Sequence, residues 1–290
     1  MSAQPLPSVS VALLAPGPCP QAAETLRVLR SRPLPRVAGV FGVGPAAAFE
    51  SGLSVRPCAP SLASAKNTAL AAAATDYVLL LAPGVVVAPC VVEDLASQMD
   101  QDPRLAATAV FPLTEGGAPL PIELRPPSLR RAALGTPPPR RPNPRLALWL
   151  PMDCALVRRE AALEIGPWPL DGAFRFDDAR WSLAARRRGW RLSLRVDLAA
   201  YLLSDRPPMD ATRKRRLRWE AAHDLWLRDA LGPARAGRLR LARRVRLALA
   251  AFALRLAARV LGSTRGPLAQ RARLAAWSLE GLRQAAKAGC

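Results

Sequence analysis

Short apolar segments alternate with helical patterns over the first hundred residues. The expected strands are Val9–Leu14, Val37–Val43, Tyr77–Leu81 and Val85–Val87, with a shorter candidate at Ser54–Pro57. The helical patterns between and after them are Gln21–Arg30, Leu62–Ala74 and Val91–Met99. Strands with no polar alternation must be covered on both faces. The pattern therefore predicts an α/β fold, with a mostly parallel sheet and helices on both of its faces.

The ends of these strands predict where a ligand would bind. In sheets of this kind, ligands lie outside the carboxyl ends of the strands. Those ends are Ala15-Pro16, Gly42 to Pro45 and Ala82-Pro83-Gly84, which we expect to line one cleft. Gly42 and Gly44 could bring main-chain N–H groups close to a phosphate, and the alternative is an ordinary glycine–proline turn.

Two adjacent acids stand where a loop enters a helix. Asp177 and Asp178 come just before a helical pattern at Ala179–Arg188, which Gly189 ends, and the alternating residues Trp190–Leu198 predict a strand. Acids at a helix start can simply cap the helix and favour its dipole. They can also form a catalytic pair. The local pattern leaves both interpretations open.

The positive charge of the chain is concentrated at its end. Residues 206–290 hold 20 Lys and Arg against 5 Asp and Glu, whereas residues 1–205 hold 22 against 17. Residues 119–145 include nine prolines, which predict a surface loop. We therefore expect an α/β domain over residues 1–205, interrupted by this loop, and a basic helical region over residues 206–290.

The basic region has helical patterns at Thr212–Asp229, Leu239–Leu261 and Leu268–Ala286. One apolar stripe on the second of them consists of Ala242, Val245, Leu249, Phe252, Leu256 and Val260. Basic amphipathic helices suit an anionic membrane surface, and the alternative is that the stripe packs on the α/β domain. Nucleic acid is a disfavoured partner, because no nucleic-acid-binding motif occurs and aromatic residues are sparse in the basic segments.

Cysteine usage and hydropathy bear on the compartment. The five cysteines are scattered without a CxxC pair, and His223 is the single histidine. These features disfavour a zinc site or a disulfide framework and suit a reducing compartment. A signal-peptide pattern is missing, and no uncharged run reaches the length of about 18 residues that a membrane span needs. We expect a cytoplasmic protein, peripheral at the inner face of the membrane.

Several sequence segments resemble the family-2 glycosyltransferases, which have the GT-A fold, and in particular the rhamnosyltransferase-like members. In the C-terminal half these segments are LVRREA from Leu156, EIGPW from Glu164, FDD from Phe176 and RRRGWR from Arg186. In the N-terminal half they are AKNTA from Ala65 and TDYVLLL from Thr75. The resemblance covers roughly residues 8–205.

The resemblance implies a reaction and a set of site residues. A sugar would pass with inversion from a nucleotide-sugar donor to a hydroxyl of a glycan or lipid-linked acceptor, as in cell-envelope polysaccharide synthesis. Asp178 would be the base and Asp177 its partner. The donor-binding positions would be Ala15, Pro16, Gly42, Gly44, Asn67, Ala82, Gly84, Arg175 and Arg180.

One departure from the family pattern affects the chemistry directly. Where the family carries an Asp-x-Asp motif that binds Mg²⁺ or Mn²⁺, this chain has Ala82-Pro83-Gly84, which offers no side-chain oxygen to a hard cation. We therefore predict no metal site and no cofactor, with Arg175 and Arg180 neutralising the departing diphosphate instead. The alternative is a catalytically inactive GT-A pseudoenzyme that acts as a partner or scaffold.

Overall fold

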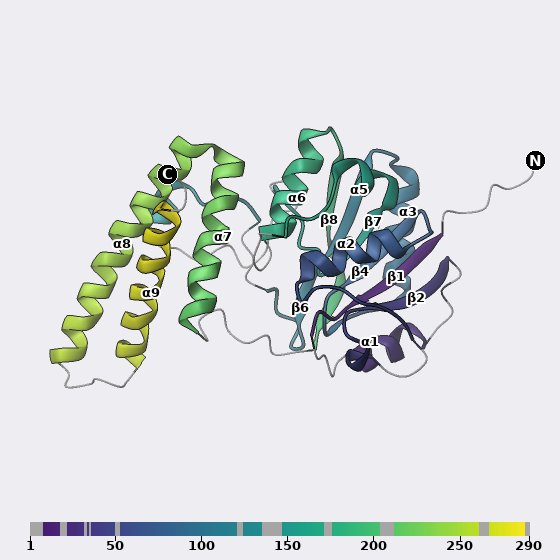
Figure 1. The fold of residues 1–290 in the computed structure, drawn as a ribbon, viewed down its shortest axis with the longest axis horizontal. Helices are drawn as coiled ribbons and strands as arrows, with labels where there is room; N and C mark the ends of the chain where they lie inside the picture. Colours follow the sequence, from purple (N-terminus) through teal and green to yellow (C-terminus); the bar gives the residue numbers. More distant parts are fainter. Residues whose placement is uncertain are drawn as a thin grey trace, which may run out of the picture. The chain divides into compact units, whose positions relative to one another are not determined.

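The computed structural model describes ten stretches of the chain: residues 8–17, 22–31, 34, 36–49, 53–120, 124–134, 147–170, 176–203, 212–260 and 267–287. Contacts between residues divide the chain into two compact units. The first consists of residues 1–125 and 139–205, and the second of residues 126–138 and 206–290. Figure 1 shows the sheet of the first unit and the helices of the second.

The first unit is built on an eight-stranded sheet with the order β3-β2-β1-β4-β7-β6-β8-β5. The strands are β1 (Val9–Leu14), β2 (Val37–Val43), β3 (Ser54–Arg56), β4 (Tyr77–Leu81), β5 (Val85–Val87), β6 (Leu105–Thr114), β7 (Cys154–Arg158) and β8 (Arg191–Leu202). Strands β3, β2, β1 and β4 are parallel to one another, and β8 is parallel to β6. Strand β7 runs antiparallel between β4 and β6, and β5 is antiparallel to β8. The predicted α/β sheet is confirmed as a mixed sheet.

The helices of this unit follow the predicted alternation with the strands. They are α1 (Ala22–Leu29), α2 (Leu62–Ala72), α3 (Pro89–Gln101), α5 (Arg159–Ile165) and α6 (Phe176–Arg187), together with the short 3₁₀ helix η1 (Ala46–Ala48). The Ser61 hydroxyl caps α2 by accepting a hydrogen bond from the N–H of Ser64 at 3.1 Å. Pro89 occupies the first turn of α3, where its missing N–H costs nothing.

Burial explains why the central strands carry no polar pattern. Every residue of β1 and of β4 is buried, because helices and neighbouring strands enclose both strands. The sheet is also curled. The Thr25 hydroxyl of α1, which follows β1, donates a hydrogen bond to the carbonyl of Val85 in β5 at the far edge, at 3.1 Å.

One expectation about elements needs correction, and one strand was missed. Strand β6 was not predicted, and it lies inside the sheet between β7 and β8. The expected strand β5 is confirmed in the same sheet as the first four strands, where it pairs with β8 at the edge. The proline-rich segment is not a loop throughout, because residues Leu129–Leu134 form helix α4. Prolines end helices, but this short run between them contains none and is free to be helical.

The second unit is an assembly of helices: α4, α7 (Arg213–Leu231), α8 (Pro233–Val260) and α9 (Pro267–Lys287). Helices α7, α8 and α9 lie side by side (Figure 1). Many of the arginines are engaged inside this unit. Arg243 of α8 contacts the buried Glu220 of α7 at 2.8 Å, and Arg240 forms two hydrogen bonds of 2.7 Å with Asp224. These charge-assisted bonds satisfy carboxylates that burial would otherwise penalise.

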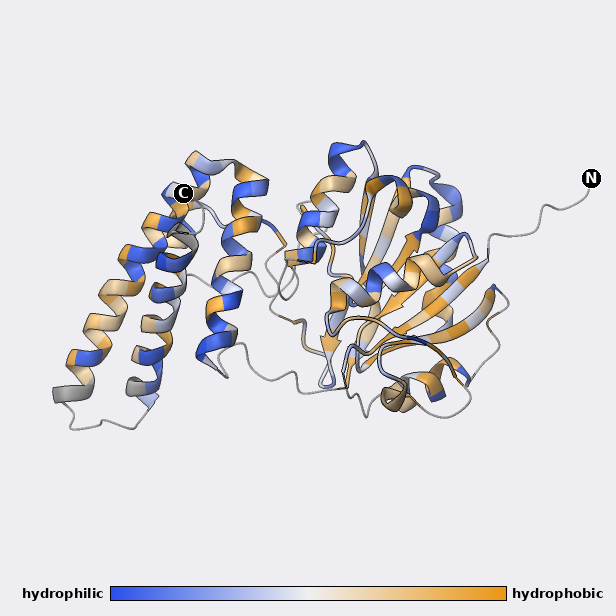
Figure 2. Ribbon diagram, viewed as in Figure 1, coloured by the Kyte–Doolittle hydropathy of each residue, from blue (hydrophilic) through white to orange (hydrophobic). Residues whose placement is uncertain are grey.

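One face of helix α8 is apolar and exposed. Its large side chains there are Leu241, Val245, Leu249, Phe252 and Leu256, which are 62%, 53%, 65%, 70% and 53% exposed. The positions that α8 does bury are Ala236, Leu239, Arg243, Leu247 and Ala251. The stripe predicted from sequence thus faces outward at its four large central positions. Figure 2 shows the alternation of hydrophobic and hydrophilic residues along α8. We call this surface the apolar face of α8.

Candidate functional site

The acid pair is bridged by a lysine from a distant part of the sequence. Asp177 and Asp178 lie in the first turn of α6, and Lys66 projects from α2. The Lys66 ammonium donates to Asp177 Oδ2 at 3.0 Å and also to Asp178 Oδ1. All three residues are 2% exposed. The sequence interpretation missed Lys66 as a site residue, although the AKNTA motif that contains it was a visible signal.

Asp178 is held at both carboxylate oxygens. Its Oδ1 accepts from Lys66, and its Oδ2 accepts from the main-chain N–H of Met152 at 3.1 Å. The Oδ1 of Asp177, by contrast, is buried and accepts no hydrogen bond from the described residues. A buried acceptor without a donor is costly unless a further group, such as water or a ligand, reaches it.

Burial raises the pKa of Asp178 to about 7, because the charged form loses its hydration. The Lys66 ammonium opposes this rise, whereas the nearby Asp177 and Asp153 carboxylates add to it. For Lys66, burial acts to lower the pKa, but attraction to Asp177 and Asp178 outweighs it and leaves the pKa above its usual value. Near neutral pH the cluster therefore contains a charged lysine beside a carboxyl group that is poised to lose or gain a proton.

Aromatic packing and hydrogen bonds hold α6 in place. Trp181 of α6 stacks on Trp168, with ring centroids 4.4 Å apart and planes 4° from parallel. Its indole N–H donates to the carbonyl of Gly166 at 3.0 Å. The Ser182 hydroxyl accepts from the N–H of Leu150 at 3.2 Å. Because these contacts lie within the turns that follow the acid pair, they fix its position relative to β7.

Asn67, a predicted donor-binding residue, has a different set of contacts. Its side-chain amide donates to the carbonyl of Trp168 at 3.0 Å and accepts from the N–H of Trp168 at 2.8 Å. The two bonds clamp α2 to the segment that precedes α6. Asn67 therefore supports the site from next to Lys66, and its contact with a donor stays a prediction.

The end of β4 lies beside the acid pair. The N–H of Ala82 donates to the carbonyl of Asp153 at 2.8 Å, and the neighbouring residue Met152 bonds to Asp178. The same sheet edge holds the ends of β1 and β2, because Leu13 pairs with Leu81 and Leu14 pairs with Val43. Ala82 therefore lies close to Asp178, and Ala15 and Pro16 follow the neighbouring strand β1 at the same edge. That these residues and Gly84 line one cleft with Asp178 stays a prediction.

The two glycines at the end of β2 have packing reasons for being glycine. A Cβ on Gly44 would lie 1.9 Å from the carbonyl oxygen of Ala15, and its φ is +152°. A Cβ on Gly42 would lie 2.9 Å from the ring of Phe49. The N–H of Gly44 donates to the carbonyl of Arg56 at 2.9 Å. This N–H group is therefore used by the sheet, which favours the turn interpretation of the Gly-x-Gly pair over a phosphate cradle.

The residues at the end of β4 do not fit a divalent cation. Ala82 and Gly84 supply no side-chain oxygen there, and the nearby Asp177 and Asp178 already bind the Lys66 ammonium. Asp76 lies at the opposite end of β4, where it accepts from the N–H of Ser8 at 3.0 Å. Within the part of the chain that the structure describes, no group of three or more His, Cys, Asp or Glu side chains could hold a metal ion.

Of the two arginines predicted to bind the donor diphosphate, the structure describes only Arg180. Arg180 is a half-buried residue of α6 that makes an interaction within the protein. It follows Asp178 by two positions, and residues two apart on a helix point in different directions. Arg175 lies outside the described residues. A role of either guanidinium toward a diphosphate stays a prediction.

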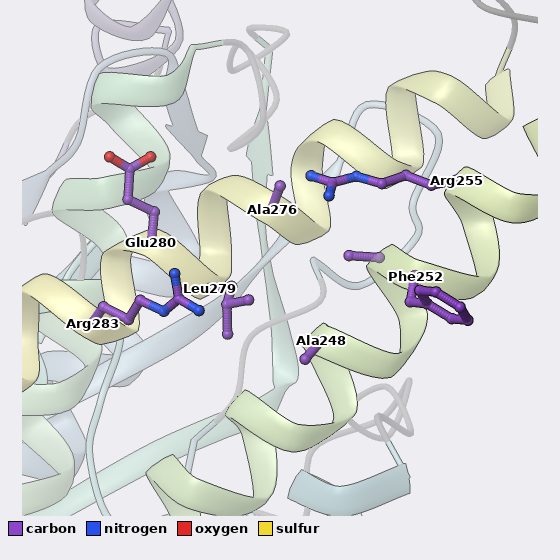
Figure 3. Close-up of a pocket in the computed structure, with 8 residues that line it drawn as sticks. Ala248, Phe252, Arg255, Ala276, Leu279, Glu280 and Arg283 are labelled. Atoms are coloured by element: carbon purple, nitrogen blue, oxygen red, sulfur yellow. The ribbon is translucent and has the colours of Figure 1, made fainter.

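The second unit has a groove of its own. It has a volume of about 290 Å³ and lies between α8 and α9, with the apolar residues Ala248, Ala251, Phe252 and Leu279 along it. Figure 3 shows Arg255 extending from α8 toward α9, where Arg283 also lines the groove. Phe252 belongs both to this groove and to the apolar face of α8. The groove thus joins an apolar surface to two exposed guanidinium groups.

Comparison with known proteins gives matches in structure but not in sequence. No family model matches this chain, and no curated protein sequence matches it significantly. The mannosyltransferase PcManGT from Pyrobaculum calidifontis, in complex with GDP-Man and Mn²⁺, matches with a TM-score of 0.57 and 18% identity, over 96% of this chain and 86% of that one. Glucosyl-3-phosphoglycerate synthase from Mycobacterium tuberculosis, in complex with Mg²⁺ and uridine diphosphate, matches with a TM-score of 0.50 and 16% identity, over 78% and 80%.

At such identities the similarity shows the fold. The sheet described above and these matches establish a GT-A fold for this chain, with additional helices at its C-terminal end. The fold expected from the sequence is therefore confirmed. The fold alone does not assign an activity.

Proposed function

We propose that this protein transfers a sugar from a nucleotide-sugar donor to an acceptor hydroxyl, with inversion at the anomeric carbon. The observation that carries the proposal is the Asp177–Asp178 pair, placed at the strand-end edge of a GT-A sheet and carrying a pKa of about 7 at Asp178. A base works best when its pKa lies near the pH at which it operates. The structural matches to transferases that bind GDP-Man and uridine diphosphate support the donor class.

The proposed step has one proton acceptor and one leaving group. The acceptor oxygen bonds to the anomeric carbon and gives its proton to Asp178. The bond from that carbon to the diphosphate breaks, and its electron pair leaves with the phosphate oxygen. Asp177 orients the acceptor through its Oδ1, which is buried and accepts no hydrogen bond from the described residues, and the arginines Arg175 and Arg180 balance the charge of the diphosphate. No part of this step is routed through a metal.

The first test is donor binding and turnover by the full-length protein. A panel of nucleotide sugars, titrated with and without Mn²⁺ and followed by thermal unfolding, should identify a donor that stabilises the fold by about 2.7 kcal/mol at a hundredfold excess over its Kd. Release of the nucleoside diphosphate should then be little changed by EDTA, because the side chains at the strand ends offer no oxygen cage for a cation. EDTA-sensitive release would contradict this assignment.

A pseudoenzyme is the alternative, and one observation favours it. The Lys66 ammonium already engages both acids, and all three groups are buried. A purely structural cluster would look the same in the unliganded protein. This alternative predicts no donor binding and no release of nucleoside diphosphate with any member of the panel, whereas the proposed transferase binds and turns over at least one.

The membrane is the second element of the proposal, and it rests on the helical unit. None of the helices in the described ranges is long and apolar enough to cross a membrane. The apolar face of α8 extends over 16 residues from Leu241 to Leu256, which is about 24 Å of helix. Exposed arginines flank it at Arg235, Arg238 and Arg255. An apolar stripe with cationic borders is the pattern of a helix that lies in the plane of an anionic membrane surface.

Continuity with the groove strengthens this choice of partner. The groove adjoins the stripe through Phe252 and places Arg255 and Arg283 where phosphate groups of anionic lipids could meet them (Figure 3). We propose a location at the cytoplasmic face of the membrane. A lipid-linked acceptor or a membrane-bound glycan would then be available to the transferase.

Vesicle binding tests this part of the proposal. Leu249→Glu combined with Phe252→Glu should weaken binding of the full-length protein to anionic vesicles by at least about 100-fold, because two large apolar side chains no longer leave water. Binding by the unaltered protein should fall as salt increases and should be lost on zwitterionic vesicles. Leu163→Glu with Leu170→Glu is the matched control, since both leucines are similarly exposed but lie in the first unit. Failure of the unaltered protein to bind anionic vesicles at low salt would refute a membrane role.

A further inference from the structure

The Lys66 cluster is unbalanced in charge. Lys66 projects from α2, Asp177 and Asp178 come from α6, and Asp153 precedes β7. Among the residues that the structure describes, these are the charged groups that act on Asp178. One ammonium stands against two carboxylates within hydrogen-bond distance, so the fully ionised trio would bury a net negative charge. Because a buried excess charge is poorly hydrated, burial of this cluster favours retention of one proton on the acid pair.

We infer that Lys66 is the positioning residue that holds Asp177 and Asp178 together as one proton acceptor and sets how strongly the pair binds its proton. The geometry behind this is the bridge from one ammonium to an oxygen of each acid, with Met152 N–H on the remaining oxygen of Asp178. Groups coupled so closely release their protons as a pair. The inference rests on the proposed transfer reaction, because it concerns the base of that reaction.

The lysine and the neighbouring acid act on the proton in opposite directions. Lys66 attracts the charged carboxylate and lowers the pKa of Asp178, whereas Asp177 repels it and raises that pKa. Removal of the ammonium in Lys66→Met should therefore move the midpoint of the pH–rate profile about 1–3 pH units higher. Removal of the second charge in Asp177→Asn should move the midpoint to lower pH. A residue that only fills space would move neither.

A measurement without turnover separates this inference from the proposed function. The raised pKa of Asp178 means that between about pH 4 and pH 7 the folded chain keeps a proton that the unfolded chain releases. Stability from this group is therefore present at low pH and is lost as the pH rises through about 7. Asp177→Asn should reduce this loss, because it leaves a balanced pair of one ammonium and one carboxylate.

The experiment measures denaturant unfolding from pH 4 to pH 9, and pH–rate profiles once a donor is known. It compares the unaltered protein, Lys66→Met, Asp177→Asn and the exposed control Lys214→Met. The inference is supported if the pH profiles of Lys66→Met shift to higher pH, those of Asp177→Asn shift to lower pH, and those of the control do not shift. If Lys66→Met does not fold, the shift of the Asp177→Asn profiles to lower pH decides the test by itself. Unchanged profiles in every folded variant overturn the inference, whereas absence of turnover with displaced stability profiles overturns only the proposed function.

Discussion

Asp178→Asn should lower the rate of sugar transfer by about 10²–10⁴-fold and leave the protein folded, because an amide cannot accept the acceptor's proton. The amide keeps the size of the side chain but turns an NH₂ group toward either Lys66 or the N–H of Met152, at a cost of about 1–3 kcal/mol. Above pH 7 the removal of a buried negative charge offsets part of that cost. Turnover measured beside denaturant unfolding checks both expectations.

A matched control is Glu164→Gln, the same chemical change at an exposed carboxylate of α5. It should leave turnover and stability unchanged. Comparable turnover in Asp178→Asn and in the unaltered protein would remove Asp178 from the mechanism. Complete loss of folding in Asp178→Asn would instead assign the cluster a structural role and favour the pseudoenzyme.

Gly44→Ala should lower the free energy of unfolding by about 3 kcal/mol, the upper end of the usual cost of overpacking. The added Cβ would meet the carbonyl oxygen of Ala15 at 1.9 Å, and main chain cannot move aside as a flexible side chain can. The φ of +152° adds strain that glycine avoids. Thermal or denaturant unfolding measures the loss.

Gly39→Ala, in the strand β2 that ends just before Gly44, is the control for this substitution. A Cβ on Gly39 would meet nothing within 4 Å, so its effect should be neutral or stabilising by about 0.4–1 kcal/mol. The pair also separates two roles for Gly44. Unchanged stability in Gly44→Ala with weakened binding of a nucleotide sugar would contradict the packing role and return the glycine to a phosphate-binding role.

The strands and helices of the first unit could be predicted because their signals are local. The buried strands β1 and β4 appear as continuous apolar runs, and glycine or proline marks their ends. Strand β6 was missed because LAATAVFPLT is rich in alanine, a weak strand former, and contains Pro112. Pro112 lies at an irregularity in the pairing of β6 with β8, where a strand tolerates proline.

The burial of a helix face could be predicted from the sequence only in part, because it depends on which elements pack against that face. The periodicity of α8 identifies an apolar face, but nothing in a single helix says what covers that face. The structure leaves Leu249 and Phe252 exposed and buries Leu239 and Leu247 instead. The burial of charged residues was equally hard to predict. An arginine such as Arg243 is expected at the surface, but it is buried and pairs with the buried Glu220.

The amino-acid sequence by itself determined the α/β alternation, the adjacent acids at the start of a helix, the end of β4 without carboxylates and the basic C-terminal helices, because each depends on neighbours along the chain. Only the tertiary structure decided that Lys66 bridges the acids from 111 residues away, and that Asn67 clamps the main chain at Trp168. Such contacts depend on how the sheet brings α2 and α6 together. The pKa of Asp178 follows from that arrangement, since burial and the nearby charges exist only once the chain has folded.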